Sequence, residues 1–128
     1  MRTLQIVVGL AIVAAGVYLA LSPLVVADAL GRPHETTSQL INLRASWGGA
    51  VMGLGAFVAW FPGPRPRLRA LLGLVLWAMA GVGLARVTGF VLDGAPDTRQ
   101  IVWITAEAAL VIGCALGLRA IRSRRARR

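Results

Sequence analysis

Three ionisable residues interrupt the apolar stretches of this sequence, and they are its clearest candidates for chemistry. Arg44 and Glu107 lie near the beginnings of the second and fourth apolar stretches, and Arg86 lies near the end of the third. If these stretches are helices that alternate in direction, Arg44, Arg86 and Glu107 lie roughly 6, 9 and 10 Å below the helix ends on one side. Charged groups at one depth in a membrane relieve their desolvation by pairing. We therefore expect Glu107 to bond Arg86 or Arg44, or both.

Two further polar residues are expected to join this cluster. Asn42 lies at a compatible depth and can supply hydrogen bonds, while Asp93 lies seven residues beyond Arg86 on the same predicted helix face. Two arginines against one deep carboxylate leave a surplus positive charge, which suits an anionic lipid headgroup or a small acid. The alternative is a structural ion pair that only sets the helix register. Other polar side chains at compatible depths are those of Tyr18, Ser46, Thr88 and Thr105.

Four apolar stretches, each about twenty residues long, must position these side chains. They cover residues 3–22, 40–61, 70–92 and 100–118. A helix of ~20 residues crosses a hydrocarbon core ~30 Å thick. The chain is 57% hydrophobic, which is more apolar surface than a soluble domain of this length could hide. We predict an all-α integral membrane protein, an up-down-up-down four-helix bundle that forms a single transmembrane domain over residues 1–128.

The charged residues predict the orientation of this domain. The net charge is +9, and every basic residue is an arginine. Arg2, the loop 62–69 and the basic tail 119–128 fall on one side, which the positive-inside rule assigns to the cytoplasm. Both termini are then cytoplasmic, and the chain is a multi-pass protein of the inner (plasma) membrane. The polar residues expected on the outer side are Asp28, Arg32, His34, Glu35, Asp93, Asp97 and Arg99.

The connections between the stretches contain helix signals of their own. Residues 24–30 either continue the first helix past a kink at Pro23 or lie in the membrane interface. Thr36, Thr37 or Ser38 could cap the second helix, and Asp97 or Thr98 the fourth. Because Pro23 directly follows the only small-residue site near the end of the first stretch, cleavage there is disfavoured and the stretch is expected to be a retained helix.

Small residues recur at four-residue spacing in the second and third stretches. Gly49 and Gly53 belong to the second stretch, and Gly81 and Gly89 to the third. Such faces let membrane helices approach closely. We expect them to pack against each other within one chain, although a homodimer face is the open alternative.

Signs of catalysis or of metal and cofactor binding are absent from the sequence. The single histidine, His34, falls in a loop, and the single cysteine, Cys114, falls inside the fourth stretch. No cluster of histidine, cysteine and acidic residues has metal-ligand spacing, and no nucleophile–base arrangement is visible. Because the arginines serve membrane topology, nucleic acid is not an expected partner. The chain is therefore predicted not to be an enzyme and to bind no cofactor.

The most motif-like segment is Asn-Leu-Arg-Ala-Ser-Trp-Gly-Gly at residues 42–49, followed by Gly53. Together with Arg86, Gly89, Asp93-Gly94 and Glu107, it resembles an uncharacterised bacterial four-helix membrane family known as domain of unknown function 4345. The resemblance covers roughly residues 5 to 120. It implies a four-helix inner-membrane protein and points to Arg44, Arg86 and Glu107, but it brings no activity.

Two classes of function remain. The first is an accessory or interaction subunit, or a lipid-binding module, whose partners are membrane lipids (anionic ones included), a larger membrane-protein complex or a second copy of the chain. The second is a small proton-coupled transporter that works as a dimer with Glu107 as the coupling carboxylate. Such a carboxylate must titrate near neutral pH, and pairing with an arginine opposes this because the cation stabilises the ionised form.

Overall fold

The computed structural model describes residues 1–31, 36–61 and 66–126, and within these ranges the chain is helical with no strand. The predicted all-α class is therefore confirmed. The elements are α1 (Arg2–Leu21), α2 (Pro23–Ala29), α3 (Thr37–Leu43), the π-helix η1 (Arg44–Gly49), α4 (Ala50–Trp60), α5 (Arg67–Leu92) and α6 (Thr98–Ala126).

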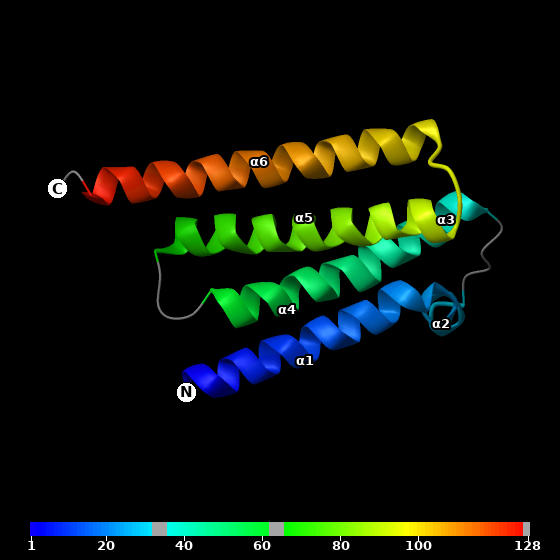
Figure 1. Cartoon of the computed structure of the whole chain (residues 1–128), viewed down its shortest axis with the longest axis horizontal. Coiled ribbons are helices and arrows are strands. Elements are labelled where there is room, and N and C mark those ends of the chain that lie inside the picture. The colour runs from blue at the N-terminus through cyan, green and yellow to red at the C-terminus, as the bar shows by residue number, and fades with distance from the viewer. Residues whose placement is uncertain (32–35, 62–65, 127–128) are drawn as a thin grey trace.

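The first apolar stretch ends in a break rather than a kink. α1 stops at Leu21, where the backbone N–H of Ser22 donates to the carbonyl of Tyr18 at 2.9 Å. Pro23 then occupies the first turn of α2, a position that needs no N–H donor. Figure 1 shows α2 as a short separate helix seen nearly end-on beside the end of α1.

The second apolar stretch is one helical segment that changes its winding. α3, η1 and α4 follow one another without a gap, and the residues at both junctions keep helical dihedral angles. Thr36 begins the segment with a capping box: the Gln39 backbone N–H donates to the Thr36 hydroxyl, and the Thr36 backbone N–H donates to the Gln39 side-chain oxygen. Of the three predicted caps, Thr36 is the one used. The π-helix coincides with most of the motif at 42–49.

The long helices lie in a row. α1 packs against α4 and η1, these pack against α5, and α5 packs against α6 (Figure 1). Directions alternate along the chain as predicted. The row differs from a bundle closed around a shared core, because α6 makes its extensive contacts with α5 only.

The two ends of the molecule carry different charges. Figure 1 shows both termini at one end, where α4 also ends and α5 begins. Arginines lie at the α1, α5 and α6 ends there, while Asp28, Asp93 and Asp97 lie at the other end. Arg32, His34, Glu35, residues 62–65 and residues 127–128 lie outside the described residues.

Backbone contact through glycines holds the middle of the row together. A Cβ added at Gly49 would lie 2.6 Å from the carbonyl oxygen of Gly81, and one at Gly81 would lie 2.7 Å from the backbone nitrogen of Gly53. A Cβ added at Gly89 would instead meet a side chain, at 3.1 Å from Ile41 Cγ1. The structure therefore places all four predicted packing glycines between α5 and the α3–η1–α4 segment, within one chain.

Apolar side chains mostly face outward, and the most buried positions include polar ones. Val102, Ile112 and Leu116 on α6 are all at least half exposed, whereas Gln100 on the same helix is fully buried. Within the described part of the chain, three helices are long and apolar enough to cross a membrane: Arg2–Leu21, Arg67–Leu92 and Thr98–Arg124.

Candidate functional site

Arg44 joins three helices at the acidic end of the molecule. Its Nε donates to Asp93 Oδ2 at 2.6 Å and its Nη2 to Asp93 Oδ1 at 2.8 Å, which makes a two-pronged ion pair. Its Nη1 donates to the carbonyl of Ala20, in the last turn of α1, where helix carbonyls lack backbone partners. Arg44 thus ties the ends of α1 and α5 to the start of η1.

The motif glycines explain how Arg44 reaches Ala20. Gly48 lies so close to α1 that a Cβ there would overlap the backbone of Ala20. Asp93 ends α5, and Gly94 turns the chain with a φ of 129° that side chains rarely adopt. The close approach of η1 to α1 and the tight turn at Gly94 together bring the Arg44 guanidinium group to the Asp93 carboxylate.

Arg86 forms a second ion pair with Glu107. Its Nε donates to both carboxylate oxygens, at 3.0 and 3.1 Å, and its Nη2 donates to Oε1 at 2.6 Å. Its Nη1 donates to Asn42 Oδ1 at 2.8 Å and to Gln100 Oε1. Arg86 is only 3% exposed, so its charge depends on these partners from α3 and α6.

Gln100 is the residue that the sequence interpretation missed. Its Nε2 donates to the Ser38 hydroxyl at 2.8 Å and to the Ser38 carbonyl at 3.1 Å, while its Oε1 accepts from Arg86. It therefore links α3, α5 and α6. A signal was present, because Gln100 lies seven residues before Glu107 and thus on the same helix face.

The predicted bond between Glu107 and Arg86 is confirmed, but the prediction that Arg44 joins them in a single Arg–Glu–Arg cluster is wrong. Asp93 pairs with Arg44 and not with Arg86, so each buried arginine has its own carboxylate, and the two pairs leave no surplus buried cation among the described residues. The reason is distance along α5: seven residues put Asp93 about 10 Å beyond Arg86, at the helix end that is closer to the shallower Arg44. Thr88 and Thr105 donate to carbonyls of their own helices, at Leu84 and Ile101, so neither joins either pair.

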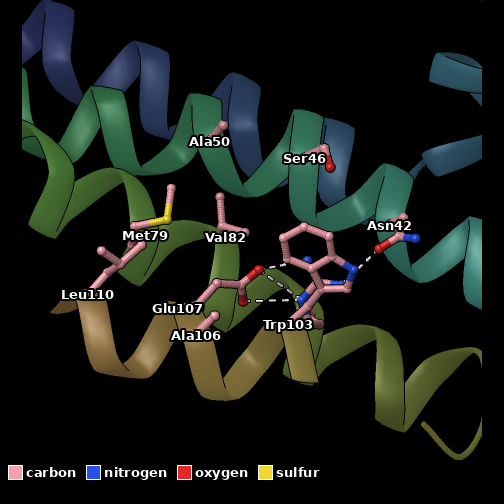
Figure 2. Close-up of a pocket in the computed structure, with 10 residues that line it drawn as sticks. Asn42, Ser46, Ala50, Met79, Val82, Trp103, Ala106, Glu107 and Leu110 are labelled. Atoms are coloured by element: carbon pink, nitrogen blue, oxygen red, sulfur yellow. Dashed lines mark hydrogen bonds and ion pairs between the residues drawn. The ribbon is translucent and has the colours of Figure 1, made fainter. Parts of the chain in front are cut away.

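A cavity of about 560 Å³ lies beside the Arg86–Glu107 pair. It opens between the η1–α4 segment and α6, with α5 as its floor, because the row arrangement leaves α6 and α4 on either side of α5. Figure 2 shows Ser46 and Ala50 on one wall, Met79 and Val82 on the floor, and Trp103, Ala106 and Leu110 on α6.

Five of the residues that line the cavity carry polar side-chain groups: Asn42, Ser46, Arg86, Glu107 and Trp103. The other five are apolar. Asn42 Oδ1 already accepts from Arg86, and its amide nitrogen is a donor without a hydrogen bond to any residue that the structure describes. The cavity therefore combines a mainly apolar lining with one hydrogen-bonding region at a neutral ion pair.

Asp97 caps α6 outside the apolar stretches. The Gln100 backbone N–H donates to the Asp97 carboxylate at 2.8 Å. Of the two predicted candidates, Asp97 and Thr98, Asp97 is therefore the cap. This hydrogen bond, helped by the Ser38 side chain and Arg99, holds the pKa of the Asp97 carboxyl below its ordinary value. Gln100 is thus positioned by its backbone as well as by its side chain.

No group of three or more histidine, cysteine or acidic side chains that could hold a metal ion occurs within residues 1–31, 36–61 and 66–126. Cys114 is buried in α6 as a free thiol.

Comparison with known proteins returns one finding. Residues 1–118 match a family described as "Domain of unknown function (DUF4345)", which confirms the resemblance inferred from the motif at 42–49. No curated protein and no solved structure matches the chain.

Proposed function

The chain belongs to the DUF4345 family, and we propose that it is a four-span inner-membrane protein that binds one lipid-like amphiphile in the cavity beside Arg86 and Glu107. The observation that carries this proposal is the cavity itself, which combines a mainly apolar lining with a hydrogen-bonding region inside an apolar protein. Its volume of about 560 Å³ falls in the ~300–1,000 Å³ range of small-molecule sites.

Membrane insertion is supported by the outward-facing apolar side chains and by three helices of sufficient length. The continuous segment from Thr37 to Trp60 would supply the fourth crossing. With the arginine-rich end in the cytoplasm, both termini are cytoplasmic and the two ion pairs lie in the outer half of the membrane.

The size of the cavity favours a lipid over a helix of a partner protein. A helix ~10 Å in diameter has a cross-section of roughly 80 Å². A cavity of about 560 Å³ is therefore small beside a membrane-spanning helix of ~20 residues, which occupies roughly 2,400 Å³. A single acyl or isoprenoid chain is narrower than a helix and needs less space. Of the accessory and lipid-binding alternatives, this geometry supports the second.

The transporter alternative receives no comparable support. Glu107 is 5% exposed and accepts three hydrogen bonds from Arg86. Buried Arg86 depends on this carboxylate for its counter-charge, so the geometry supports a structural ion pair and not a coupling site.

The proposal is tested by blocking the cavity. Ala106 lines it and Ala109 does not, although both are exposed alanines of α6. We expect native mass spectrometry of protein extracted with its own lipids to show one retained lipid per chain in the wild type and in Ala109→Phe, and loss of that lipid in Ala106→Phe. Equal lipid retention in both variants, or none in the wild type, would refute the proposal.

A further inference from the structure

We infer that the polar group bound in this cavity is a neutral carbonyl oxygen, as in an acyl ester or a quinone, and not an anionic headgroup. The inference rests on the proposed function, because it names the class of amphiphile that the cavity beside Arg86 and Glu107 takes.

The charges of the site argue against an anion. Each buried arginine faces its own carboxylate, and all three nitrogens of Arg86 already donate to protein oxygens. Glu107 itself lines the cavity, so a negative headgroup would approach a carboxylate without gaining an unpaired cation. Burying such an anion carries a desolvation penalty that nothing here offsets.

The unused polar groups of the lining are hydrogen-bond donors. Asn42 Nδ2, the Ser46 hydroxyl and Trp103 Nε1 form no hydrogen bond within the described residues. The amide nitrogen and the indole nitrogen can only donate, and the hydroxyl can donate as well. Their complement is a group that accepts and carries no proton of its own, and a carbonyl oxygen meets both conditions.

The donors occupy the outer part of the cavity. Asn42 and Ser46 are four residues apart on the α3–η1 segment, and Trp103 is one turn from Glu107 on α6. Figure 2 shows Asn42, Ser46 and Trp103 towards one side of the lining and Met79 and Leu110 towards the other. The carbonyl would lie at the donor end, near the outer boundary of the hydrocarbon core, and the apolar chain would run inward.

The test compares lipids that differ only in the carbonyl or only in charge. The probes are ester-linked phosphatidylcholine, its ether-linked counterpart without carbonyls, ester-linked phosphatidylglycerol and decylubiquinone, offered in competition and read by native mass spectrometry. We expect the ester lipid to outcompete the ether lipid about fivefold, the factor that one net hydrogen bond supplies. The neutral and anionic ester lipids should bind equally, within about twofold. Displacement by decylubiquinone would identify the carbonyl source as a quinone, and resistance to it would identify an acyl ester.

Conservative variants report on individual donors. Ser46→Ala and Trp103→Phe each remove one donor and keep most of the shape, so each should reduce the ester preference while Ala109→Phe leaves it unchanged. Equal binding of ester and ether lipids, or a preference for phosphatidylglycerol whatever its linkage, would overturn the inference. If either result occurred while Ala106→Phe still lost its lipid, the proposed lipid binding would hold and only the carbonyl inference would fail. A wild-type protein that retains no lipid would refute both the proposed function and the carbonyl inference.

Discussion

Replacing Glu107 with glutamine should destabilise the protein strongly. The change keeps the size of the side chain but removes the negative charge that faces Arg86 Nε and Nη2 at 2.6 to 3.1 Å. Breaking a buried pair in this way costs ~3–5 kcal/mol, because an uncompensated charge remains buried. Asn42 and Gln100 still accept from Arg86 Nη1, so we expect the lower end, about 3 kcal/mol.

Equilibrium unfolding in mixed detergent micelles measures this loss. Asp28→Asn is the matched control, because Asp28 is an exposed acid with no ion pair among the described residues, and it should change the free energy of unfolding by less than about 0.5 kcal/mol. The double variant Arg86→Leu with Glu107→Leu removes both charges. Its loss of unfolding free energy should be well below the sum of the losses measured for Arg86→Leu and Glu107→Leu singly. A Glu107→Gln protein as stable as the control, or strictly additive losses, would refute the assignment of a mutually dependent pair.

Three further predictions concern packing, pH and topology. Gly81→Ala should destabilise by about 1–3 kcal/mol because its Cβ would meet the backbone of η1 and α4, while Gly113→Ala, which faces open space, should be neutral or slightly stabilising in the same unfolding assay. Because the pKa of Asp97 is lowered in the folded protein, its capping contribution is present above the ordinary pKa of an aspartate and is lost as pH falls through the lowered value. The protection factor of the Gln100 amide, its intrinsic exchange rate divided by the observed rate, should therefore fall in acid in the wild type and be low at all pH values in Asp97→Ala. An Asp97→Ala protein with the wild-type protection factor would contradict the cap. A periplasm-active reporter fused to the C-terminus should be inactive and a cytoplasm-active one active, and the reverse result would overturn the proposed orientation.

The sequence alone predicted those features that depend on position along a helix. Apolar length indicated helices able to span a membrane, and the fixed rise per residue placed Arg86 and Glu107 at one depth, where they do pair. Small residues at four-residue spacing indicated the contact of α5 with η1 and α4. Each of these inferences needs only the regular geometry of one helix.

Pairing between helices needed the tertiary structure. Which carboxylate meets which arginine depends on how each helix is rotated and how closely it lies to its neighbours, and Gly48 and the π-helix bring Arg44 to α1 and Asp93 in a way that helical periodicity does not predict. Gln100 was missed because a neutral amide at the edge of an apolar stretch gives no charge signal, although three helices meet on it. The cavity exists because α6 makes its extensive contacts with α5 and leaves a gap towards η1 and α4. Composition and spacing specify single helices, whereas a site between helices is decided by the packing of backbones that glycines allow.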